Sequence, residues 1–126
     1  MEIKIHSYNN LQIAEIIAEG IIIASVEDGT ELTGTVYYQG VDNLLIYEKN
    51  ITPAFFDLTT GTAGEMLQKF SNFRPRLAII GDFSKYPGKS SRDFMVESNR
   101  TGHIYFLGSQ TEAIEKLSKG QSTITT

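Results

Sequence analysis

The side chains best suited to chemistry are acids and hydroxyls that follow short apolar segments. Glu48 follows the apolar segment 44–47. Asp82 and Ser84 follow the apolar segment 77–80. Such segments are typical of buried parallel strands, and α/β proteins bind ligands beyond the carboxyl ends of these strands. We therefore expect Glu48, Asp82 and Ser84 to share one rim of a sheet.

A cluster of hydroxyl groups precedes a well-marked helix. Apolar residues at i, i+3, i+4 and i+7 give residues 62–70 one buried face, and Thr62 opens a capping-box spacing. The start of a helix can bind an anion, a partner's carboxylate or a phosphoryl group. Asp57, Thr60 and Thr62 are therefore candidate binding residues. The plainer interpretation is that Thr59, Thr60 and Thr62 only cap the helix.

Aromatic side chains occur in the same loops. Phe55 and Phe56 come directly before Asp57, and Phe83 and Tyr86 follow the second apolar segment. Most such side chains cover a core, but several exposed together would mark a partner or dimer surface. Phe55 and Phe56 therefore join the candidate partner- or ligand-binding residues.

Several kinds of catalytic and metal site have no basis in the sequence. The chain has no cysteine, and His6 and His103 have no metal-site spacing. Phosphate-loop, dinucleotide-binding and nucleophile-elbow motifs are also missing. Paired carboxylates for acid–base catalysis have only their loop positions to support them. We therefore expect no catalytic residue, no metal and no cofactor.

Composition indicates one ordinary globular domain. The 126 residues are 40% hydrophobic and 21% charged, with a net charge of -4. The basic residues are scattered, which argues against nucleic-acid binding. No apolar run has the length of a membrane span, and no signal peptide is evident. We expect a cytoplasmic protein.

Residue patterns predict a strand–helix alternation. Alternating apolar residues predict an antiparallel hairpin of strands 2–8 and 11–18, joined by Asn9-Asn10. Residues 25–38 are ambiguous. Ser25 with Asp28 resembles a helix start, but each of the two internal glycines costs about 1 kcal/mol in a helix. A strand over residues 31–38 is therefore the alternative. Helix is the preferred interpretation, because the alternating layout needs one there.

The rest of the chain continues the alternation. A helix is expected from Ser90 or Ser91 to about Asn99, and a last helix from the Ser109 capping box to Gly120. The whole predicts a single α/β domain over residues 1–120 with a mixed, mainly parallel sheet, an N-terminal hairpin and about four helices. A polar tail follows over residues 121–126.

Two family resemblances accompany these patterns. The segment 57–64, Asp-Leu-Thr-Thr-Gly-Thr-Ala-Gly, resembles the Asp-Ser-Ser-Gly-Leu-Gly turn of STAS domains, the SpoIIAA-like fold. This likeness in pattern covers residues 40–118 and implies a STAS-like layout, with Thr60 in the place of the serine that antagonist proteins phosphorylate. The chain departs from the STAS pattern by its Thr-Thr pair and by an extra segment, 52–56, before the aspartate.

The chain as a whole is more similar to an uncharacterised bacterial family, domain of unknown function 4180. Residues 50–58, 81–84 and 92–99 carry that likeness. This second resemblance implies no activity.

Two functional hypotheses follow from the sequence. The first is a non-enzymatic STAS-like regulatory or partner-binding module that uses the start of the 62–70 helix and the Phe55-Phe56 loop. The second is a small-molecule or anion-binding protein, with weak enzymatic activity at the loops after the parallel strands. The expected partners are a protein, a second copy of the chain or a small ligand.

Overall fold

Five strands form one mixed sheet in the computed structural model, which describes residues 1–8, 11–57, 61, 64–65, 68, 76–86, 88–102 and 104–122. The strands are β1 (Glu2–Tyr8), β2 (Leu11–Ile17), β3 (Asn43–Tyr47), β4 (Arg76–Ile80) and β5 (Ile104–Leu107). They lie across the sheet in sequence order. β1 is antiparallel to β2, and β2 through β5 are parallel. The expected α/β domain with an N-terminal hairpin is confirmed.

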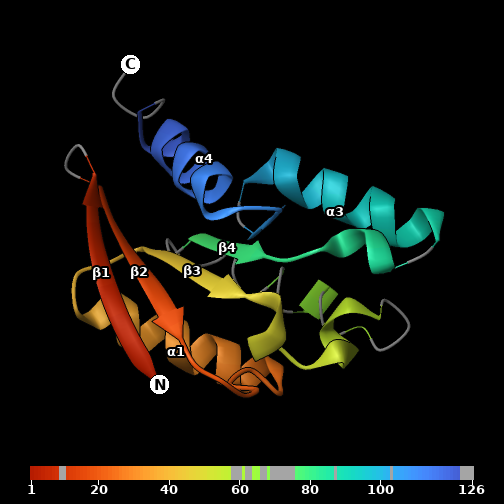
Figure 1. The fold of residues 1–126 in the computed structure, drawn as a ribbon, viewed down its shortest axis with the longest axis horizontal. Coiled ribbons are helices and arrows are strands. Elements are labelled where there is room, and N and C mark those ends of the chain that lie inside the picture. The colour runs from red at the N-terminus through yellow and green to blue at the C-terminus, as the bar shows by residue number, and fades with distance from the viewer. Residues whose placement is uncertain are drawn as a thin grey trace.

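Helices cover both faces of the sheet. The described α-helices are α1 (Val26–Tyr38), α3 (Lys89–Thr101) and α4 (Gln110–Ser122). Figure 1 shows the sheet between α1 on one side and α4 on the other, and α3 packs along β5. The expected helix at 62–70 lies mostly outside the described residues, although Gly64, Glu65 and Gln68 are helical. None of the described helices is long and apolar enough to cross a membrane.

Alternating side chains of the strands build two hydrophobic cores. Leu44 and Ile46 of β3 point toward the α1 face, where Phe94 and Met95 of α3 also pack. Leu45 points toward the α4 face. All three side chains are at most 1% exposed. The central strands are therefore buried on both faces, as their uninterrupted apolar sequences indicate.

The ambiguous segment is a helix, as preferred. The Ser25 hydroxyl accepts a hydrogen bond from the Asp28 amide and caps the helix start. Thr33 and Gly29 are both buried, and the Thr33 hydroxyl donates to the Gly29 carbonyl over 2.7 Å. Thr30 donates in the same way to the carbonyl four residues earlier. The threonines of this helix thus satisfy their hydroxyls locally, within the helix itself.

Two helix boundaries differ from the sequence expectation. α3 begins at Lys89 rather than at Ser90 or Ser91, because Gly88, with a φ of 110°, turns the chain into the helix without a side-chain cap. α4 continues past Gly120 to Ser122, two residues into the expected tail. One glycine near a helix end costs only about 1 kcal/mol, too little to end the helix by itself.

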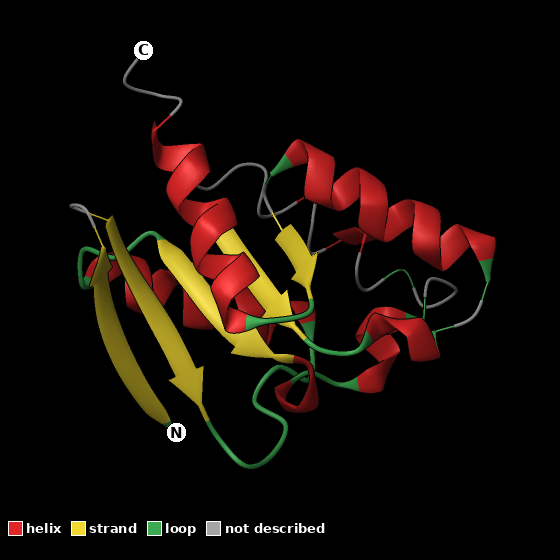
Figure 2. Cartoon of the chain, turned by 45° about the horizontal axis from the view of Figure 1, so that its top comes forward, coloured by secondary structure: helices red, strands yellow, loops and turns green. Residues whose placement is uncertain are grey.

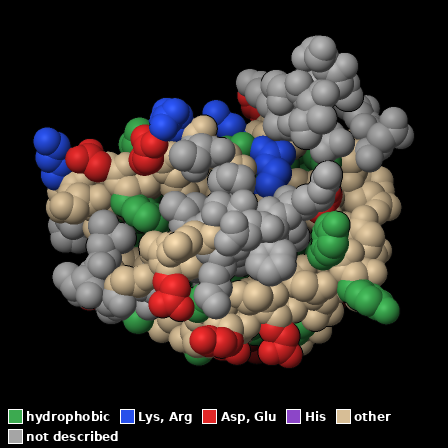
Figure 3. Space-filling view, turned by 180° about the vertical axis from the view of Figure 1, so that it is seen from behind, with side chains coloured by type: hydrophobic (Ala, Val, Ile, Leu, Met, Phe, Trp, Pro, Cys, Tyr) green, Lys and Arg blue, Asp and Glu red, His purple; other side chains and the backbone are tan. Residues whose placement is uncertain are grey.

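Charge is unevenly distributed on the surface. On the face seen from behind, acidic side chains lie along the lower edge, and both acidic and basic side chains lie along the upper edge (Figure 3). The first turn of α1 contributes Glu27 and Asp28 to the acidic charge of the molecule. This face therefore has a mixed upper edge and a negative lower edge.

Candidate functional site

The rim at the carboxyl ends of β3 and β4 is organised around Glu48. Glu48 opens the short 3-10 turn Glu48–Asn50 after β3, and Lys85 and Tyr86 end the turn after β4. The Glu48 carboxylate accepts a hydrogen bond from the Tyr86 hydroxyl and lies 2.8 Å from the Lys85 Nζ. Its side chain is only 10% exposed, whereas that of Lys85 is 57% exposed. One largely buried carboxylate therefore joins the loops of two neighbouring strands.

Glycine at position 81 makes room for this carboxylate. A Cβ atom at Gly81 would lie 2.5 Å from Glu48 Oε1 and 2.6 Å from Glu48 Cβ. The Gly81 amide donates to the Leu107 carbonyl over 3.0 Å, so the backbone cannot easily move aside. The position of Glu48 therefore depends on the missing side chain at Gly81.

Aromatic rings hold the rim from below. The Phe56 ring stacks on Tyr86 with centroids 5.0 Å apart and meets Phe55 edge-on at the same distance. Phe83 meets the ring of Phe106 edge-on at 5.4 Å. Phe55 and Phe56 are only 1% and 4% exposed. Both rings therefore fill the core and support the rim, as most aromatic side chains of such loops do, and a partner contact of their loop stays a prediction.

The Tyr86 hydroxyl stays protonated over a wide pH range. Burial raises its pKa most, and the hydrogen bond to Glu48 and the negative charge of that carboxylate raise the pKa further. Tyr86 is therefore a fixed hydrogen-bond donor to Glu48.

Two of the other expected residues, Asp82 and Ser84, hydrogen-bond to each other. The exposed Asp82 carboxylate accepts from the Ser84 amide over 3.1 Å and from its hydroxyl over 2.5 Å. These hydrogen bonds lower the pKa of Asp82. Asp57 is also exposed, and Thr60 and Thr62 lie outside the described residues. The sequence thus placed Glu48, Asp82 and Ser84 after neighbouring strands, but it missed Lys85 as a partner of Glu48.

A second polar cluster was missed entirely. Glu15, only 8% exposed, accepts hydrogen bonds from His6 Nε2 and the Tyr47 hydroxyl, both over 2.7 Å. Its position in β2 has the same parity as Leu11 and Ile13, which point into the α4-side core. An acid in line with buried apolar residues was the signal in the sequence that could have revealed this cluster.

Hydrogen bonding keeps Glu15 ionised despite its burial. Burial raises the pKa of Glu15, but hydrogen bonds from Tyr47 and His6 outweigh burial and leave the pKa below its ordinary value. Burial, the hydrogen bond to Glu15 and the Glu15 charge together raise the pKa of Tyr47 to about 12. Among the described residues, no group of three acids or histidines is placed to hold a metal ion.

The chain belongs to the family described as domain of unknown function (DUF4180), whose model matches residues 8–117. No curated protein and no solved structure matches the chain. The family description carries no activity, so the function has to be argued from the site.

The space at Gly81 gives a stability prediction. Gly81→Ala should lower the free energy of unfolding by about 1–3 kcal/mol, because the new methyl group overlaps Glu48. Gly34→Ala is the control: it adds a methyl to open space on α1 and should stabilise the protein by about 0.5–1 kcal/mol. Urea denaturation measures both. Equal stability of Gly81→Ala and the wild type would contradict the described packing of Glu48.

The Tyr47 hydroxyl gives a pH prediction. Its raised pKa contributes stability that is fully present below pH 10.0 and is lost as the pH rises through about 12. The stability advantage of the wild type over Tyr47→Phe should therefore shrink across this interval. The lowered pKa of Glu15 acts in the opposite direction, because its contribution is lost as the pH falls. Urea denaturation at a series of pH values measures this difference. A difference in the free energy of unfolding that stays constant from pH 10.0 to about 12 would contradict the Tyr47–Glu15 hydrogen bond.

Proposed function

We propose that the protein is a non-enzymatic partner-binding module whose contact surface is the rim at the carboxyl ends of β3 and β4. The observation that carries this proposal is the double engagement of Glu48 by Lys85 and Tyr86. These contacts of Glu48 fix two loops above the packed aromatic rings. They leave Asp82, Ser84 and the Lys85 stem facing solvent. A rigid polar surface of this kind suits recognition of another protein with little loss of conformational entropy.

The pairing of the rim acids favours binding over acid–base catalysis. A general base must reach the proton that it removes from a substrate. The Glu48 carboxylate is already bonded to two neighbours, and Asp82 is bonded to Ser84. Both carboxylates therefore stabilise the conformation of their own loops.

We further propose that the domain has a STAS-like layout. The alternation of strands and helices in β3, β4, α3, β5 and α4 supports this part of the proposal. A regulatory module of this type would bind its partner through loops at one end of the sheet. The role of Thr60 as a phosphoryl acceptor rests on the resemblance alone.

Binding of an anion or another small molecule at the same rim is the second candidate. The observation that favours it is the 57% exposed side chain of Lys85, next in sequence to Ser84 in the loop after a parallel strand. A rise in melting temperature with inorganic phosphate or nucleotides, abolished by Lys85→Glu, would support this candidate over the partner-binding one.

Affinity capture from the source cell tests the partner surface. We expect Lys85→Glu and Asp82→Arg to weaken capture of the partner at least about tenfold, since each reverses an exposed rim charge. Asp82→Arg removes neither partner of Glu48, and a urea denaturation curve of this variant shows whether loss of the Asp82–Ser84 bonds destabilises the protein. Lys116→Glu, an exposed change on α4, is the matched control and should bind as the wild type does.

Two results would contradict the proposed function. One is that the wild-type protein, even after cross-linking, retains no partner. The other is that both rim variants and the α4 variant bind a partner equally well.

A further inference from the structure

The two edges of the sheet differ in their protection. At the β5 edge, the Asn99 side chain of α3 accepts from the Phe106 amide over 2.7 Å and donates to the Phe106 carbonyl over 3.1 Å. Ser98 donates to the Ile104 carbonyl over 2.5 Å. Side chains of α3 thus occupy the backbone groups that another strand would use.

The β1 edge has no such cover among the described residues. β1 is seven residues long and pairs only with β2 on its inner side. Figure 2 shows β1 at the outer edge of the sheet, away from α4. Met1 and Ile5 beside this edge are 72% and 42% exposed. A long edge strand with exposed apolar side chains is a template for pairing with another strand.

We propose that β1 pairs with β1 of a second copy of this chain, antiparallel, about a two-fold axis through Ile3. This register places Ile3 opposite Ile3, Met1 opposite Ile5 and Glu2 opposite Lys4 of the partner copy. The exposed apolar side chains then cover one another on the α1 side of the sheet. On the other side, each acid faces a base, so the strand is complementary to itself, as a two-fold interface requires.

Neighbouring registers lack this complementarity. An axis through Lys4 places two lysines opposite each other, which is unfavourable in an antiparallel pair. An axis through Ile5 places Lys4 opposite His6 and Glu2 opposite Tyr8, so neither charge gains an acid–base pair. The alternating sequence of β1 therefore selects the axis at Ile3.

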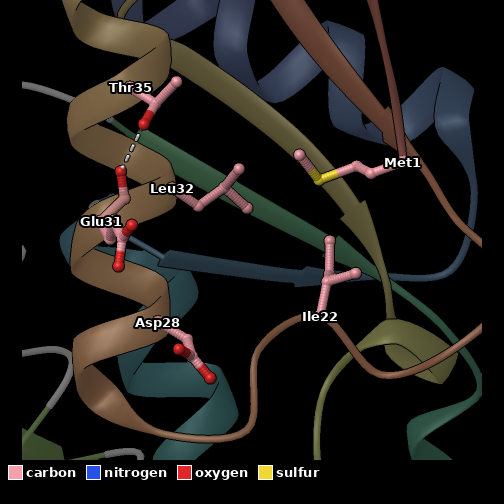
Figure 4. Close-up of a pocket in the computed structure, with 6 residues that line it drawn as sticks. All are labelled: Met1, Ile22, Asp28, Glu31, Leu32 and Thr35. Atoms are coloured by element: carbon pink, nitrogen blue, oxygen red, sulfur yellow. Dashed lines mark hydrogen bonds between the residues drawn. The ribbon is translucent and has the colours of Figure 1, made fainter.

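A cavity lies beside the start of β1, next to the same edge. Its volume is about 240 Å³, and its lining comes from α1, the chain start and the loop after β2. Figure 4 shows Leu32 on α1 and the apolar side chains of Met1 and Ile22 on the opposite side. Because the proposed register sets Ile5 of the second copy opposite Met1, that side chain adds apolar surface beside the cavity.

Light scattering after gel filtration, run over a concentration series, tests the dimer. The wild type should have twice the 14.0 kDa mass of one chain. Ile5→Lys should be monomeric, because it puts a charge into the apolar contact. Val96→Lys is the matched control: Val96 is a 68% exposed apolar residue on α3, and its change should leave the dimer intact. Circular dichroism confirms that each variant is folded.

Charge exchange tests the register. Glu2→Lys and Lys4→Glu should each weaken dimerisation on the order of tenfold, because like charges then face each other at two symmetric places. The double variant Glu2→Lys/Lys4→Glu restores both pairs and should restore the dimer. A misfolded variant would not be rescued in this way.

Every other outcome counts against the proposal. A wild type that is monomeric at all concentrations, or that binds only a different protein through β1, overturns it. A dimer that persists in Ile5→Lys places the interface elsewhere. Loss of the dimer in Ile5→Lys without rescue in the double charge variant overturns the axis at Ile3.

Discussion

The hydrogen bond from the Tyr86 hydroxyl to the Glu48 carboxylate joins the loops that follow the two central strands. It forms because β3 and β4 are parallel neighbours, so both chains leave the sheet at the same edge. Gly81 supplies the space, and the stacked ring of Phe56 holds Tyr86 in place. This bond and the Lys85–Glu48 ion pair together fix the positions of the two loops relative to each other.

The sheet behind this rim offers two different surfaces. Its carboxyl end presents fixed polar groups, which suit recognition of another molecule. Its β1 edge presents unpaired backbone with apolar and charged side chains in alternation, which suits a second strand. The β5 edge is closed by Asn99, so growth of the sheet is confined to one side. Self-association at β1 would leave the rim open to a partner, because the two surfaces lie on different margins of the sheet.

Most of the fold could be predicted from local sequence patterns. Alternating apolar residues located the hairpin, and short apolar runs located the parallel strands, because strand periodicity depends only on neighbouring residues. The 25–38 segment was harder, since helix propensity takes no account of the burial of Gly29 or of threonine hydroxyls that bond to carbonyls of their own helix. The expected start of α3 was wrong by one or two residues. Gly88 turns the chain into the helix by its positive φ, without a capping side chain that the sequence would reveal.

The site was less accessible to sequence reasoning than the fold. Position after a strand was enough to select Glu48, but its partners depend on which strands are neighbours and on the space left by Gly81. Phe55 and Phe56 were expected on a contact surface, because the sequence alone does not show whether an aromatic loop is buried. Its burial depends on tertiary packing. Glu15 escaped notice because its partners come from two other strands.

A double-mutant cycle between Glu48 and Tyr86 tests the central contact most directly. Unfolding free energies are measured for the wild type, Glu48→Ala, Tyr86→Phe and the double variant. A hydrogen bond to a partly buried charge predicts a coupling energy of about 1–2 kcal/mol. The cycle of Glu48→Ala with Ser84→Ala, whose hydroxyl bonds Asp82 instead, should show no coupling. A Glu48–Tyr86 coupling energy of zero would contradict the account of a rim joined through Glu48.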